Sequence, residues 1–419
     1  MTDLHLQRLD RVSLVAALIT PLLLMHAHGF AEASMAVVAV TFLVRCAITG
    51  QWRWLRETWM ILSLVWCAWL TLASLHLPAL GLEGGGTRAV LQALMSIRFP
   101  LFAAALAFGA PSDAEGRIWM FRVVAASVVY ICVHTVFQFF FGVNLYGMRP
   151  AWGVLLTGPF GSARAAPILA RLMLPAVIPA AARFLPLRMP RQLWAYALLL
   201  GGMAVIAIIG QRIPVLLGGG GLLIAALLMP RLRPAVLAAA IATALLIPSF
   251  AVIAPSIYFR LVPDTQRMLT SFATTRYGEL YARALEIGEQ RPIVGLGFDG
   301  FGLGCPQPRY FRPSFDGTAA DGGGTDICWV HPHNFYFEAL ATGGFPGVTL
   351  FAALALAWLI PLGRGLWRNP DPLRVGLFAT TLAQLVPFQS TGSFWSMPMG
   401  GWFYLLVGWG LAEARAHRS

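Results

Sequence analysis

The residues best suited to chemistry stand near the end of the segment 254–346, which separates two groups of long apolar runs and is expected to be mostly water-exposed. There the chain reads His331-Pro332-His333-Asn334, just before an apolar run begins again. His333 is a candidate general base, because an imidazole changes its charge close to physiological pH. Asn334 is suited either to orient a hydroxyl group or to cap the helix that follows. The alternative is that both histidines are polar residues at a membrane interface and that Asn334 acts only as a cap.

The same segment contains a second candidate, on a helix expected over Thr274–Gln290. The apolar stripe of this helix consists of Leu280, Ala284 and Ile287. Arg276 and Arg283 are seven residues apart and therefore project from nearly the same face. Two guanidinium groups on one face could clamp a pyrophosphate through bidentate hydrogen bonds. The alternative is a solvated helix face on which Glu279 pairs with Arg283.

The elements that must position these residues are membrane helices. Hydrophobic residues make up 58% of the 419 residues and charged residues 11%, whereas about one-quarter of a soluble domain is charged. The mean hydropathy is +0.70. The apolar runs are continuous rather than alternating, and in lipid only helices or closed barrels satisfy the backbone. The sequence therefore predicts an all-α polytopic membrane protein.

We expect about twelve spanning helices, with one large, partly helical loop between the ninth and the tenth. Residues 1–254 would hold the first nine helices, residues 255–346 the loop, and residues 347–419 the last three helices and a short tail. The first apolar run has no small-residue cleavage site after it, so the first helix is expected to stay as an anchor. Candidate chemistry thus falls in the loop and at the rim of the membrane.

The positive charge predicts which side the loop faces. The net charge of +12 comes from arginine alone, since the sequence contains no lysine. Arginine-rich short links mark the inner side of a membrane, and this distribution predicts both termini inside and the large loop outside. Four arginines on the outer side are not explained by that rule, and ionisable groups at membrane depth are functional candidates. They are Arg164, Arg212, Arg276 and Arg283.

Two of the five cysteines, Cys305 and Cys328, lie in the large loop, 23 residues apart. A disulfide between them is expected if the loop faces an oxidising compartment, and it would constrain a glycine-rich segment. Their spacing does not suggest a zinc site, and the acidic residues of the loop form no paired motif for another metal. No basic stretch is typical of nucleic-acid binding.

Taken together, these segments form a recognisable series. His333-Asn334 is followed by nine residues, Gly344, two residues and Gly347. Arg212 ends the sequence Ile209-Gly210-Gln211-Arg212 at the outer end of a span. The expected arginine helix is followed by Pro292-Ile293-Val294-Gly295-Leu296-Gly297, and Gly158–Ala166 contains a Gly-Pro-Phe-Gly turn. In order and sidedness the series resembles the O-antigen ligase and O-antigen polymerase superfamily. Two positions depart from its pattern: Gln211 stands where serine is usual, and Tyr281 stands where tryptophan is common.

This resemblance implies a fold like that of the GT-C glycosyltransferases in a bacterial inner membrane, with the active site on the periplasmic side. Ligases of this type transfer a glycan from undecaprenyl pyrophosphate to a sugar hydroxyl of lipid A–core, without a metal or other cofactor. By this resemblance Arg212 and either Arg276 or Arg283 would bind the pyrophosphate, Arg164 would assist, and His333 would be the catalytic base. Asn334, Gly344 and Gly347 would support the motif. Direct displacement would invert the anomeric centre.

Three other functions remain open from the sequence. A polymerase of the same superfamily joins glycan repeats to each other, and an oligosaccharyltransferase directs them to protein. A twelve-helix transporter belongs to a different class and would place polar residues near the middle of the bilayer. Convergence of Arg212, Arg276, Arg283 and His333 on one outward-facing cavity would distinguish the enzymes from the transporter.

Overall fold

The chain folds almost entirely into helices, as predicted. The computed structural model describes residues 3–315, 317, 319–329, 331–387 and 392–417. The helices of the first part are α1 (Asp3–His26), α2 (His28–Thr49), α3 (Thr58–Ala73), α4 (Gly86–Met95), α5 (Arg98–Phe108), α6 (Ala114–Phe141), α7 (Ala165–Phe184), α8 (Leu193–Ile209), α9 (Arg212–Leu228) and α10 (Arg233–Ile253). The helices of the second part are α11 (Pro255–Leu261), α12 (Pro263–Thr270), α13 (Arg276–Gln290), α14 (Gly300–Gly304), α15 (Phe335–Gly363), α16 (Pro372–Leu385) and α17 (Met399–Ala416). Short 3-10 turns are η1 (Arg53–Arg56), η2 (Pro78–Leu80), η3 (Ala110–Ser112), η4 (Pro230–Leu232), η5 (Phe272–Thr274) and η6 (Pro308–Tyr310).

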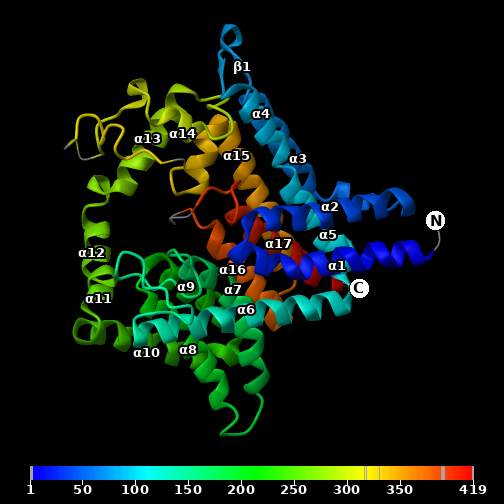
Figure 1. Ribbon diagram of the computed structural model, residues 1–419, viewed down its shortest axis with the longest axis vertical. Coiled ribbons are helices and arrows are strands. Elements are labelled where there is room, and N and C mark those ends of the chain that lie inside the picture. Colours follow the sequence, from blue (N-terminus) through cyan, green and yellow to red (C-terminus); the bar gives the residue numbers. More distant parts are fainter. Residues whose placement is uncertain (1–2, 316, 318, 330, 388–391, 418–419) are drawn as a thin grey trace.

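The fold class of a helical polytopic membrane protein is confirmed. Within the described residues, seven helical segments are long and apolar enough to cross a membrane. They are α1, α2, α4 together with α5, α6, α7, η4 together with α10, and α15. The apolar helices α3, α8 and α9 are shorter, and α16 and α17 complete the helices that correspond to the twelve expected spans. In Figure 1 the two chain ends lie close together at the right, and α11, α12 and α13 lie at the left.

One large apolar core joins the membrane helices. Helix α7 packs against α16, α8 and α6, while α17 packs against α5. Trp66, Trp358 and Trp402 are fully buried in this core. Because α7 is covered on several sides, side chains near its first turns are held in fixed positions.

The segment after α10 divides into two parts. Helices α11 and α12 form a strap, visible at the left of Figure 1, that connects α10 with α13. Ile257 and Leu261 of α11 are buried against Ala207 of α8 and Phe250 of α10. The strap is therefore fixed to the membrane helices by its own apolar contacts.

The second part has a core of its own. The expected apolar stripe of α13 is buried there against Phe301, Tyr310 and Ile327. Helix α13 begins one residue after Thr275, whose hydroxyl accepts a hydrogen bond from the Gly278 amide at 3.3 Å, as N-cap residues do. A short hairpin after α3, β1 (His76–Leu77) paired with β2 (Leu82–Glu83), reaches this part: Glu83 makes ion pairs with Arg291 and Arg309.

Helix α15 is broken at Gly344. This glycine adopts φ +66° and ψ −163°, so a short first segment and a longer second segment meet at an angle. A Cβ at Gly344 would lie 2.6 Å from the carbonyl oxygens of Pro292 and Ile293, and the Phe345 amide donates to the Pro292 carbonyl at 2.8 Å. The backbone of the Pro-x-x-Gly-x-Gly turn therefore lies directly against the break, which only glycine permits.

Candidate active site

A cavity of about 570 Å³ lies under the strap and is called here the arginine cavity. Its walls come from the first turns of α7, α9 and α17, from α11, α12 and α13, and from His331, His333 and Gln384. This volume falls in the range of ordinary small-molecule sites, about 300–1,000 Å³. Segments far apart in the sequence are thus brought to one place.

Arg212 reaches the cavity because of a glycine. Gly210 ends α8 in the left-handed conformation, φ +73°, as glycine does at helix ends, and the chain then turns into α9, whose first residue is Arg212. The Nη1 atom of Arg212 is buried and has no hydrogen-bond partner among the described residues. A buried donor without a partner is costly, so a ligand oxygen at this point would be strongly favoured.

Arg171, inside the first half of α7, is a cavity residue that the sequence analysis did not select. It is 9% exposed, and it donates from Nε to Gln384 Oε1 at 3.0 Å, from Nη1 to the Pro167 carbonyl at 2.6 Å and from Nη2 to the Met399 sulfur at 2.9 Å. All three partners are neutral. The signal that could have revealed it is an arginine within a predicted span.

Arg164 and Arg260 complete the cationic lining. Arg164 is the N-cap residue of α7 and approaches His28 Nε2 at 3.2 Å. Burial lowers the pKa of Arg260, the Asp264 carboxylate opposes this, and the Arg212 guanidinium lowers it further. Arg260 and Arg212 therefore repel one another across the cavity.

The cavity has an excess of positive charge. Its lining contains four arginines and a single carboxylate, that of Asp264. Within the described part of the chain, no carboxylate lies within 4.0 Å of any of these four guanidinium groups. The N-terminal ends of α7, α9 and α17 also open on the cavity, and each adds a partial positive charge that favours anions. The arrangement is suited to a multiply charged anion.

Two histidines form the other wall. The ring centroids of His331 and His333 are 4.5 Å apart, and the His333 ring also contacts Tyr277 at 5.7 Å and Trp329 at 5.8 Å. Both ring nitrogens of His331 are buried without a hydrogen-bond partner among the described residues. Burial and the neighbouring His333 lower the pKa of His331 to about 4, so His331 is neutral at physiological pH.

His333 has an unusual backbone conformation. Its φ is +59°, in the left-handed region that few residues other than glycine adopt. Such strain persists only where surrounding structure enforces it, and it is concentrated at functional sites. The next residue, Asn334, enforces it by starting α15: its Oδ1 accepts from the amides of Tyr336 and Phe337, and its Nδ2 donates to the Pro387 carbonyl. Asn334 is thus observed as a cap.

The glycines of the motif are structural. Gly344 permits the break in α15, and a Cβ at Gly347 would lie 2.9 Å from the Ala339 carbonyl oxygen. Neither lines the arginine cavity. The spacing from Asn334 to Gly344 fixes the length of the first segment of α15 and so the place of His333 relative to the membrane helices.

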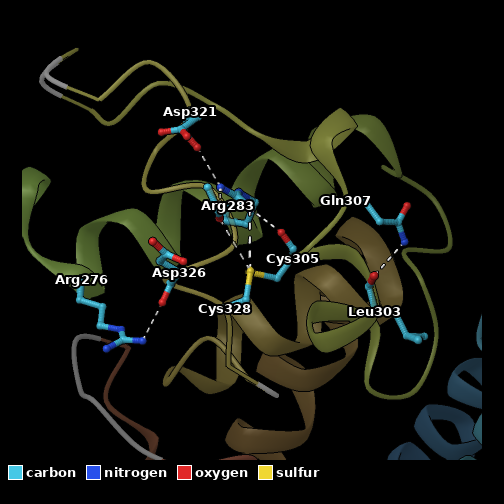
Figure 2. The surroundings of a disulfide bond; sticks show 9 residues. Arg276, Arg283, Leu303, Cys305, Gln307, Asp321, Asp326 and Cys328 are labelled. Carbon is cyan, nitrogen blue, oxygen red and sulfur yellow. Dashed lines mark hydrogen bonds between the residues drawn. A yellow bond between two sulfur atoms is a disulfide. The ribbon is translucent and has the colours of Figure 1, made fainter.

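Arg283 is enclosed in the loop rather than in the cavity. It is 1% exposed. Its guanidinium donates to the carbonyl oxygens of Cys305, Asp321 and Gly324, as Figure 2 shows for the first two. Cys305 and Cys328 form a disulfide directly beside it. In this geometry Arg283 holds the disulfide-bonded loop together. Arg283 does not line the arginine cavity, so the structure does not place it where a pyrophosphate in that cavity would bind.

Arg276 is also outside the cavity lining, at the exposed start of α13. Its Nη2 donates to the Asp326 carbonyl at 3.0 Å (Figure 2), and its guanidinium lies 5.0 Å from the centre of the Trp329 ring. Trp329 in turn contacts His333. The structure thus brings Arg164, Arg212 and His333 together, and among the described residues Trp329 connects Arg276 to them.

Among the described residues, no group of three histidine, cysteine or acidic side chains is placed to hold a metal ion. The fold and the site together define a multi-pass helical membrane protein with a cationic cavity beside a paired histidine wall.

Comparison with known proteins supplies the family. The family model described as O-antigen ligase matches residues 194–352, a range that includes Arg212, the whole disulfide-bonded loop and the His333 motif. This match supports membership of the O-antigen ligase superfamily and an activity of the O-antigen ligase or polymerase type, that of a glycosyltransferase-like enzyme. No curated protein matches the chain.

Proposed function

We propose that the protein is an O-antigen ligase of the bacterial inner membrane, which transfers a glycan from undecaprenyl pyrophosphate to a sugar hydroxyl of lipid A–core on the periplasmic side. The observation that carries this proposal is the arginine cavity. It combines four guanidinium groups without a carboxylate partner among the described residues with a histidine pair on the opposite wall. A pyrophosphate and a reacting hydroxyl are the two groups that such a site would accommodate.

In this proposal the arginines stabilise the leaving group. Negative charge grows on the pyrophosphate as its bond to the anomeric carbon breaks, and fixed cations in a partly dry cavity stabilise that charge more than water does. Arg212 and Arg171 would contact the phosphates directly, assisted by Arg164 and Arg260. Guanidinium groups suit this task because they bind phosphate oxygens in a bidentate manner, and the reaction would need no metal ion.

His333 would act on the acceptor. The hydroxyl oxygen attacks the anomeric carbon, the bond between that carbon and the pyrophosphate oxygen breaks, and the hydroxyl proton passes to the His333 imidazole. Attack from the side opposite the leaving group inverts the anomeric centre. Neutral His331 would support His333 in this role, because a second charged imidazole at this distance would oppose protonation of His333.

The proposal is tested with the purified protein in liposomes supplied with undecaprenyl-pyrophosphate glycan, with and without lipid A–core, in excess chelator. Glycan on lipid A–core under these conditions is the expected result. Longer lipid-linked glycan with lipid A–core unchanged would make the protein a polymerase, with the same site and a different acceptor. Loss of all transfer in chelator, restored by a metal ion, would contradict the metal-free mechanism.

His333→Ala tests the base assignment in the same assay. General base catalysis contributes about 10²–10⁴-fold, so transfer should fall by that factor while donor binding persists. His331→Ala is the matched control on the same wall, and its loss should be smaller. Equal transfer by His333→Ala and the unsubstituted protein would exclude His333 as the base.

A further inference from the structure

A second cavity, here called the aromatic cavity, lies on the other side of Arg164. Its volume is about 550 Å³, and its lining includes His26, Tyr146, Phe160, Ser162 and Arg164. Arg164 lines both this cavity and the arginine cavity. A ligand that extends beyond the reacting groups could therefore continue from one cavity into the other past a single side chain.

The chemistry of the lining is distinct from that of the arginine cavity. It combines aromatic rings with hydroxyl and imidazole groups, and among the described residues that line it none is acidic and only Arg164 is cationic. The ring centroids of His26 and Phe160 are 5.5 Å apart. The Tyr130 hydroxyl links the set, at 3.1 Å from His26 Nε2 and 2.9 Å from the Tyr146 hydroxyl. Aromatic faces beside neutral polar groups suit a ligand that has an apolar face and a polar edge.

The loop that carries Tyr146 and Phe160 is held rigidly. Gln138 of α6 is 1% exposed and bonds the loop at the Met148 carbonyl and at both the amide and the hydroxyl of Thr157. Asn144, also 1% exposed, donates to the Gly158 carbonyl and accepts from the amides of Tyr146 and Met148. Buried amide side chains satisfied in this way fix the backbone. The cavity is therefore preorganised, which lowers the entropy cost of binding.

We propose that the aromatic cavity is a saccharide subsite. A sugar ring has a face of C–H groups, which stacks on aromatic rings, and an edge of hydroxyl groups, which bonds to tyrosine, serine, histidine and arginine side chains. The subsite rests on the proposed function, since both the donor and the acceptor of a glycan ligase carry sugars. The bound sugar is either a residue of the donor glycan or a residue of the acceptor core, and Arg164 connects it to the pyrophosphate end of the reaction.

Direct binding tests the subsite without any transfer reaction. The full-length protein in nanodiscs is titrated with two probes: the core oligosaccharide and the donor glycan, each released from its lipid by mild acid. We expect one of them to bind and Gly161→Trp to weaken that binding at least tenfold. The nearest atom to a Cβ at Gly161 is the Met148 sulfur at 3.8 Å, so a large side chain fits there and fills the cavity. Leu145→Trp is the control, because Leu145 is half exposed on the same loop and lines neither cavity.

Kinetics identify the source of the sugar. Tyr146→Ala should raise KM about tenfold for one of the two substrates and leave kcat within about twofold. A higher KM for the acceptor would show that the cavity binds a sugar of the core. A higher KM for the donor would show that it binds a sugar of the donor glycan. Leu145→Ala should change neither KM. The subsite does not exist if the unsubstituted protein binds neither oligosaccharide. It is also excluded if the Gly161→Trp variant binds the oligosaccharide as tightly as the unsubstituted protein. Both outcomes hold whatever the result of the transfer assay.

Discussion

Arg212 of the arginine cavity has a buried guanidinium nitrogen without a hydrogen-bond partner among the described residues, whereas the guanidinium of Arg283 is enclosed by three carbonyl oxygens beneath the disulfide-bonded loop. Arg212 of the cavity and Arg283 of the loop both lie in the part of the chain that the family model matches, and the sequence marks both as candidates. The difference teaches that the surroundings of an arginine, rather than its place in a motif, separate a binding role from a folding role. Substitutions in the arginine cavity should therefore lower kcat/KM, and substitution of Arg283 should lower the free energy of unfolding.

The largest effect is expected in the cavity, from Arg212→Ala. Removing a preorganised donor to a developing negative charge typically costs about 10²–10³-fold in rate, so kcat/KM should fall by that factor. The midpoint of thermal unfolding should change by less than about 2 °C, because within the described residues the buried Nη1 of Arg212 has no hydrogen bond that the substitution would remove. Arg267→Ala, which removes an exposed cation of α12 outside the cavity lining, is the control. If Arg212→Ala lost as much stability as Arg283→Ala, the two regions would not differ in the way described.

Arg283→Ala should show the opposite pattern. Two buried carbonyl groups and a partly buried one lose their donor, and each unsatisfied buried group costs about 1–3 kcal/mol, so the free energy of unfolding should decrease by about 3 kcal/mol or more. Activity per folded molecule should stay within about twofold. Thermal unfolding and transfer are measured on the same preparation. A fully stable variant without activity would show that Arg283 acts in the chemistry after all.

Arg276→Ala tests the connection between the two regions. A cation–π contact is worth about 0.5–1 kcal/mol at an exposed site, and kcat/KM should therefore fall about two- to fivefold through a less well-placed Trp329 and His333. Trp329→Ala should have a similar effect, and the double variant should lose no more than either single one, because both act through one contact. Additive losses would indicate separate roles.

The smallest effect concerns pH. The pKa of His331 is lowered to about 4 in the folded protein, against about 6.5 in an unfolded chain. As the pH falls from 6.5 towards 4, the unfolded chain binds a proton that folded His331 does not, so protonation favours unfolding and stability decreases. His331→Asn should remove part of this slope. Thermal midpoints at pH 7.5 and 4.5 check it, and equal slopes for both proteins would contradict the burial of this imidazole.

Much of the fold followed from the apolar runs, because backbone satisfaction in lipid leaves little choice but a helix. The helix at residues 276–290 and its buried stripe also followed from periodicity. The seven-residue spacing of Arg276 and Arg283 was correctly interpreted as one helix face, but it could not reveal that the disulfide-bonded loop covers only the middle of that face. Arg276 is thus exposed while Arg283 is buried.

The composition of the cavity was harder to foresee. Arg171 and Arg260 lie on α7 and α11, nearly ninety positions apart in the numbering, and the packing of α7 against α8 and of α11 against α8 and α10 brings them together. Arg171 did carry a signal, an arginine within an apolar run, whereas Arg260 resembles any loop arginine. The signal for the aromatic cavity was partial: the Gly158–Ala166 segment belonged to the recognised series, whereas a tyrosine such as Tyr146 at a membrane surface is typical of an interfacial belt.

The break at Gly344 has a consequence for how the enzyme tolerates different bilayers. Spanning helices adjust their tilt when the hydrocarbon thickness changes. The second segment of α15 can tilt in this way, while the first segment stays fixed to the 292–297 turn by the bonds from Leu296 to Ala341 and from Gly297 to Thr342. We expect the break to absorb part of a change in tilt, because a continuous helix would pass the change on to the segment that follows the histidine wall.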